Sequence, residues 1–163
     1  MLTIQLHKKQ QGDVILKCIR QDGSSTWAKL HQGTVYHDLA HIAIEEKLEF
    51  KSGFYGRLAS GIAISDYELP ADKKPERLRG KNLPKEALIA EHLVNLLCIE
   101  LLSNTHFDLI YQAQTILEQH KLPFPKKLNN ARLNTIRAYL NQLIIQWNEV
   151  PLGTYLERKF KIN

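Results

Sequence analysis

The spacing of apolar residues changes at about Gly33, and this change divides the chain into two parts. Residues 2–6 alternate apolar and polar side chains, which is the pattern of a half-buried β-strand. Turn signals at residues 11–13 and 22–23 separate two further segments that read as strands. Consecutive strands joined by tight turns pair antiparallel, so residues 1–32 predict a three-stranded antiparallel meander.

Beyond Gly33 the apolar residues recur every three or four positions, which is the spacing of amphipathic helices. Segment 68–83 interrupts this pattern with prolines and many charges, and it predicts an exposed polar loop. We therefore expect an α+β fold in a single domain, residues 1–163, in which residues 33–163 form a bundle of four to five helices. The predicted helices span residues 35–50, 54–63, 84–102, 104–120 and 129–147.

The composition is that of an ordinary globular protein, with 44% hydrophobic and 24% charged residues. The two cysteines, Cys18 and Cys98, form no CxxC pair, which argues against a disulfide framework and against a zinc–cysteine site. Residues 1–9 alternate in polarity, unlike a signal peptide, and polar residues interrupt the apolar segment 87–102. These features predict a cytoplasmic protein without a membrane span.

The charge balance is basic, with a net charge of +5 and a sequence pI of about 9.2, so nucleic acid is a candidate partner. The basic residues are dispersed, however, and their two densest groups lie at residues 73–81 and 158–161. Runs of this kind are usually solvated, and we expect an exposed loop at the first group and an exposed tail at the second.

One short segment carries most of the functional chemistry. His37 and His41 are four residues apart, with Asp38 beside the first and Glu45 four residues after the second. On a helix this spacing places the two imidazoles one turn apart on nearly the same face, where both can reach one metal ion. The sequence therefore predicts a site for zinc or another first-row transition metal, with His37 and His41 as ligands.

Helix geometry limits what this segment can do alone. Residues eight apart are about 12 Å apart along the helix axis, so one ion does not readily take both His37 and Glu45. Asp38 and Glu45 are therefore candidates for a general base, or for a carboxylate that orients a ligating histidine. Glu91 is the best candidate for a third ligand, because it interrupts an apolar segment on a face that looks buried. His92 and Asn95 interrupt the same segment and are further candidates, and the weaker ones are Asp66, Glu68, His106 and His120.

Three enzyme patterns fit the segment less well. The zinc-protease pattern HExxH requires glutamate where this chain has Asp38, and no third ligand follows at the usual interval. Metal phosphohydrolases with a histidine–aspartate dyad use ligands from helices before the dyad, whereas here only predicted strands precede it. A nucleophile beside a base is not visible, because Cys18 lies in a predicted strand and Cys98 in an apolar helix.

A resemblance extends over the first part of the chain, up to Gly61. Residues 36–45, YHDLAHIAIE, are followed by residues 53–61, GFYGRLASG. These segments resemble those of small uncharacterised bacterial proteins that have an HDLxHxxxE motif followed by a GFxGxLAxG-like stretch. The resemblance implies a bacterial cytoplasmic protein, and it brings no activity with it.

The same residues also permit an interpretation without metal. The stripe of His37, His41 and Glu45 can be a hydrogen-bonded polar cluster that fixes two helices together, or the solvent face of its helix. The protein would then be a non-enzymatic interaction or regulatory module, or a homodimer in which the stripe provides specificity. The sequence therefore leaves two hypotheses, a metal site that can be hydrolytic and a structural cluster.

Overall fold

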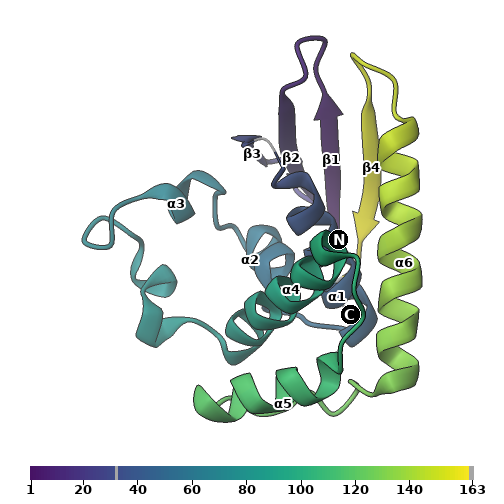
Figure 1. The fold of residues 1–163 in the computed structure, drawn as a ribbon. Coiled ribbons are helices and arrows are strands. Elements are labelled where there is room, and N and C mark those ends of the chain that lie inside the picture. Colours follow the sequence, from purple (N-terminus) through teal and green to yellow (C-terminus); the bar gives the residue numbers. More distant parts are fainter. Residues whose placement is uncertain (32, 162–163) are drawn as a thin grey trace.

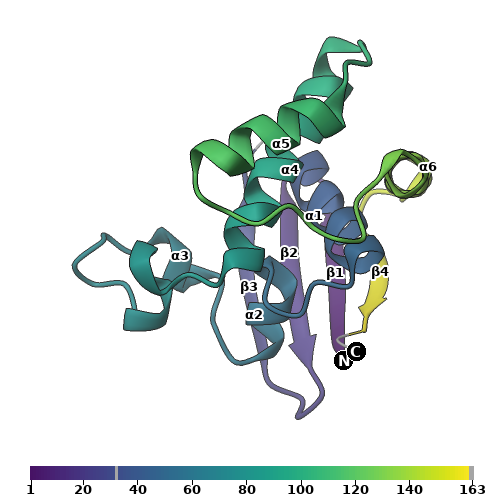
Figure 2. The ribbon, with the colours of Figure 1, turned by 90° about the horizontal axis from the view of Figure 1, so that it is seen from below.

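The structure is a computed structural model, and it describes residues 1–31 and 33–161. It contains one antiparallel sheet with helices packed against it around a single core (Figures 1 and 2). The first three strands form the meander that the sequence predicted, and the α+β fold is confirmed. The strands are β1 (Leu2–Lys8), β2 (Val14–Arg20), β3 (Ser25–Leu30) and β4 (Tyr155–Phe160).

The fourth strand, β4, includes most of the basic group at residues 158–161, for which the sequence predicted an exposed tail. It pairs antiparallel with β1, with Phe160 opposite Leu2, and the sheet order is β3-β2-β1-β4. Phe160 is fully buried, and its ring centroid lies 5.7 Å from that of Tyr55. The prediction of a tail, and of a purely helical part after residue 33, was wrong because one aromatic side chain, and not an apolar run, anchors this strand.

Five helices lie in the predicted segments, although the helix predicted over 54–63 ends at Ala59, the one predicted over 104–120 begins at Leu109, and the short helix Ser65–Glu68 was not predicted. The side chain of Asp108 accepts a hydrogen bond from the backbone N–H of Tyr111, and that of Asn129 accepts one from Arg132, so both residues cap the helix that follows. None of the described helices has the length and apolar composition of a membrane span. The helices are α1 (Val35–Leu48), α2 (Phe54–Ala59), α3 (Ser65–Glu68), α4 (Lys85–Ser103), α5 (Leu109–Gln119) and α6 (Asn130–Glu149).

Helix α1 is central to the fold. It packs against α4 and α6, and its Leu39 and Ile42 are fully buried, as the helical spacing predicted. The hydroxyl of Tyr139 on α6 donates to Glu46 Oε2 at 2.7 Å. Because α1 is enclosed on most sides, its remaining polar side chains need partners inside the protein.

The polar segment between α2 and α4 extends to one side of the molecule and returns to the start of α4 (Figure 1). It contains α3, which ends where the predicted polar loop begins, and two 3-10 turns within that loop, Glu76–Leu78 and Gly80–Asn82. Leu78 is buried, and the Nη2 atom of Arg57 donates to the backbone carbonyl of Arg77 at 2.9 Å. These two contacts fasten the loop to the body of the protein, on the side where α1 faces α4.

We expect Phe160→Ala to lower the free energy of unfolding by about 3–5 kcal/mol, the usual cost of truncating a buried phenylalanine. Urea denaturation followed by circular dichroism measures this change. Leu152→Ala is the control, because Leu152 is 53% exposed and its truncation should cost less than about 0.5 kcal/mol. Equal costs for the two variants would mean that Phe160 does not anchor β4.

Candidate metal centre

Glu91 of α4 lies opposite both histidines of α1. Its Oε2 atom is 3.8 Å from His37 Nε2, and its Oε1 atom is 3.5 Å from His41 Nε2. One ligand atom from each of the three side chains lies within 4.8 Å of the other two. The prediction that Glu91 reaches the histidine pair is therefore confirmed, and the three side chains can hold one metal ion.

Glu45 is fully buried and orients His41. Its Oε1 atom lies 3.0 Å from His41 Nδ1 and accepts a hydrogen bond from the backbone N–H of Phe54 at 2.8 Å. Its Oε2 atom accepts one from the backbone N–H of Tyr55 at 3.1 Å. With Nδ1 held in this way, His41 presents Nε2 to Glu91, which is the arrangement typical of metal-ligating histidines. Both oxygens of Glu45 are occupied and shielded from solvent, so it fits the orienting role and not that of a general base.

Two glycines allow this close approach of α2 to α1. A Cβ atom added at Gly53 would lie 2.4 Å from Glu45 Oε2, and one added at Gly56 would lie 2.1 Å from the backbone carbonyl oxygen of Lys51. Both distances are shorter than any contact that a carbon atom tolerates. The absence of a side chain at Gly53 is therefore a condition for the position of Glu45, and its absence at Gly56 is a condition for the path of the chain at Lys51.

The electrostatics of the cluster favour a positive charge at His41. Burial alone would lower the pKa of His41, but the hydrogen bonds and charges of Glu45 and Glu91 outweigh it and raise the pKa to about 10. The same hydrogen bond with His41 lowers the pKa of Glu91. Burial, followed by the charge of His41, lowers the pKa of His37. The site thus stabilises one added cationic charge, carried either by a proton or by a metal ion.

Asp38 lies outside this cluster. Burial raises the pKa of its carboxyl group to about 7. Burial and then the charge of Asp38 raise the pKa of Cys18 on β2 to about 12. The same two causes raise the pKa of Tyr55 on α2. The charges of His41 and Glu91 in turn act on the pKa of Asp38, the first lowering it and the second raising it. The role of general base for Asp38 stays a prediction.

The other candidate ligands on α3 and α4 also lie apart from the cluster. His92 stacks on His120, with ring centroids 4.5 Å apart. The carboxylate of Asp66 accepts a hydrogen bond from a backbone N–H three residues before it, at 3.1 Å. Glu68 and Asn95 are exposed. None of these residues belongs to the group whose ligand atoms converge in the described part of the chain.

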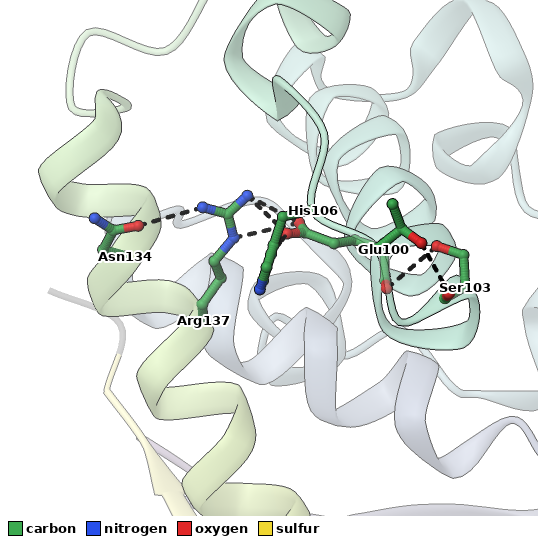
Figure 3. A network of polar contacts seen from close by, with 6 residues as sticks. Glu100, Ser103, His106, Asn134 and Arg137 are labelled. Atoms are coloured by element: carbon green, nitrogen blue, oxygen red, sulfur yellow. Dashed lines mark hydrogen bonds and ion pairs between the residues drawn. The ribbon is translucent and has the colours of Figure 1, made fainter.

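Glu100, and not Glu91, is the buried carboxylate of α4. The side chain of Glu91 is 52% exposed and that of Glu100 is 4% exposed, so the prediction that Glu91 occupies a buried face was wrong. Figure 3 shows Glu100 between Arg137 of α6 and His106, with Arg137 Nη2 at 2.8 Å from Glu100 Oε1. Glu100 follows Leu96 by one helical turn, a spacing that places it on the buried face. This network joins α4 to α6 and also accounts for the candidate His106.

Three polar residues that sequence analysis did not single out lie beside the cluster. Arg57, Tyr67 and Lys74 line a cavity of about 150 Å³ together with His41 and Glu91. A signal for Arg57 exists in the sequence, because it is the charged residue of a short helix otherwise made of small and apolar residues. The other two lie in the segment between α2 and α4, where apolar spacing gives no indication of how the chain runs.

The chain was compared with models of protein families, with curated proteins and with solved structures, and nothing matches it significantly. The resemblance to bacterial proteins with the HDLxHxxxE motif therefore stays an expectation.

We expect Gly53→Ala to lower the free energy of unfolding by roughly 1–3 kcal/mol, because the new methyl group would overlap the carboxylate of Glu45. Thermal and urea denaturation measure the change. Gly80→Ala is the matched control, since a Cβ atom there meets nothing within 4 Å and the backbone φ is not positive. A cost for Gly53→Ala no greater than that for Gly80→Ala would contradict the tight packing of Glu45.

Proposed function

We propose that this protein binds one divalent first-row transition-metal ion, zinc above all, through His37, His41 and Glu91. The observation that carries the proposal is the convergence of three ligand atoms within 4.8 Å of one another. Two histidines with one carboxylate form a ligand set that zinc commonly uses in catalytic sites, where three protein ligands leave a fourth position open.

The surroundings of the three ligands support a catalytic site over a purely structural one. Structural zinc sites usually have four protein ligands, whereas three side chains converge here and the cavity of about 150 Å³ borders two of them. When bound, an ion with an open position supplies Lewis-acid and water-activating chemistry. The reaction class that we propose is therefore metal-assisted hydrolysis, with Glu45 as the positioning residue that fixes His41.

The second candidate is a structural ion network in an interaction or regulatory module. One observation favours it, namely that Glu45 and Glu91 raise the pKa of His41 to about 10. A protonated His41 shared by two carboxylates satisfies all three groups without a metal ion. Metal binding distinguishes the two candidates, since an ion has to displace this proton and the network alone has no need of one.

The test is elemental analysis of the natively purified protein, followed by zinc titration of the metal-free chain. We expect about one zinc ion per chain, and an affinity that falls as the pH is lowered, because a ligating imidazole must be neutral. Glu91→Gln and His37→Gln should each weaken binding by more than roughly 100-fold, beyond the loss of about 10–100-fold typical of groups that only orient a ligand. Both side chains are partly exposed, so both variants should fold.

His92→Gln is the matched control for these variants. His92 is adjacent to Glu91 in the chain, yet its ring stacks on His120 and does not belong to the cluster. Its replacement should leave zinc affinity unchanged. A wild-type protein that binds no zinc, nickel or manganese, and whose melting temperature does not respond to any of them, would overturn the metal site in favour of the structural network.

A further inference from the structure

The cavity beside the proposed metal site has walls of two different kinds. The proposed metal ligands His41 and Glu91 line it together with Arg57, Tyr67 and Lys74. The remaining wall is apolar and includes side chains of α4 and of the polar segment before it. Its volume of about 150 Å³ is small beside the roughly 300–1,000 Å³ of pockets that bind drug-sized ligands. A cavity of this size holds a compact group and not a nucleotide or a polymer segment.

Arg57 brings a buried positive charge to this cavity. It is 6% exposed, and no carboxylate lies within 4.0 Å of its guanidinium group in residues 1–31 and 33–161. Of its five N–H donors, one is directed to a protein acceptor in this part of the chain, the backbone carbonyl of Arg77. Fully buried arginines almost always have an anionic partner. The guanidinium therefore has both the charge and the free donors to bind an anion.

Tyr67 supplies a second unsatisfied group in the same cavity. Its hydroxyl oxygen is buried and has no hydrogen-bond partner among the described residues. Burial raises the pKa of this hydroxyl to about 12, so it stays protonated and can donate. The Tyr67 ring also packs 5.4 Å from the guanidinium carbon of Arg57. The two side chains thus lie against each other, and both residues line the cavity.

We propose that this cavity binds a compact oxyanion, the phosphate or carboxylate group of a small substrate, through Arg57, Tyr67 and Lys74. The inference rests on the proposed function, because it names the substrate class of that site: the anion would be held in a cavity that the metal ligands His41 and Glu91 also line. Two positive side chains and a neutral hydroxyl donor complement such a group. Because the cavity is small, the rest of the substrate is either small or extends out of the cavity into solvent.

The test is calorimetric titration of inorganic phosphate and, separately, of acetate into zinc-loaded protein freed of excess zinc by gel filtration. We expect saturable binding of at least one of the two at one site per chain. The two arms distinguish the sources of the oxyanion, because the anion that binds more tightly identifies the group that the cavity accepts. Binding of neither anion to protein that has taken up zinc would overturn the inference and leave the metal site intact.

Tyr67→Phe is the sharpest variant, because it removes only a hydroxyl that has no partner in the described structure. We expect an unchanged or raised melting temperature together with anion affinity weakened roughly tenfold, the loss typical of one hydrogen bond to a charged group. Tyr111→Phe is the matched control, since Tyr111 is 60% exposed on α5 and should leave the affinity unchanged. Equal affinities for wild type and Tyr67→Phe would show an adventitious ion only.

Arg57→Lys keeps the charge but removes the planar group of five donors, and it should also weaken anion binding. Its control is Arg20→Lys, because Arg20 likewise donates to backbone carbonyls, at Leu58 and Ile62, but does not line this cavity. If no zinc binds, the proposed function fails separately, and the same titrations on the metal-free chain decide the anion site. Loss of binding in Arg57→Lys and not in Arg20→Lys would then support it, and no binding would overturn it.

Discussion

The buried carboxylate of Glu45 holds the site together. It is fully buried, where an unpaired charge would cost a large free energy. Its partners are His41 Nδ1 and the first two backbone N–H groups of α2. One side chain therefore fixes three things: the ring orientation of His41, the start of α2, and the spacing between α1 and α2. The position of α2 in turn sets where Tyr55 enters the core and where Arg57 faces the cavity. The missing side chain at Gly53 belongs to the same arrangement, because that carboxylate fills the space.

The site consists of a rigid part and a less regular part. The rigid part is the pair α1 and α4, which pack against each other and present His37, His41 and Glu91. The less regular part is the segment that carries Tyr67 and Lys74, which is made of short turns rather than long elements. Ligands on rigid helices suit a metal ion, which tolerates little error in distance. Recognition groups on a connecting segment suit a substrate, because such segments vary without loss of the scaffold.

Sequence reasoning succeeded where short-range spacing decides the structure and failed where distant segments decide it. Alternation gave the meander, and the four-residue interval gave the histidine pair. Glu91 was found from a wrong premise, since the spacing of a long apolar helix does not say which face meets a neighbour, and Glu100 is the residue that is buried. The strand at Phe160 depends on pairing with the other end of the chain. Arg57 and Tyr67 meet because of the path of an irregular segment, for which apolar spacing carries no information.

The pairing of β4 with β1 has a consequence for how the protein acquires its structure. β1 lies inside the sheet, between β2, which follows it by a few residues, and β4, which is separated from it by most of the chain. During synthesis, the meander and the helices exist before β4 does, so the outer edge of β1 stays open with its backbone donors and acceptors unpaired. Contacts of such large sequence separation are also slow to form. Until β4 pairs with β1, this edge can pair with a strand of another copy of the chain. Once β4 is in place it is the edge strand, and its polar and basic side chains make it poorly suited to further strand addition.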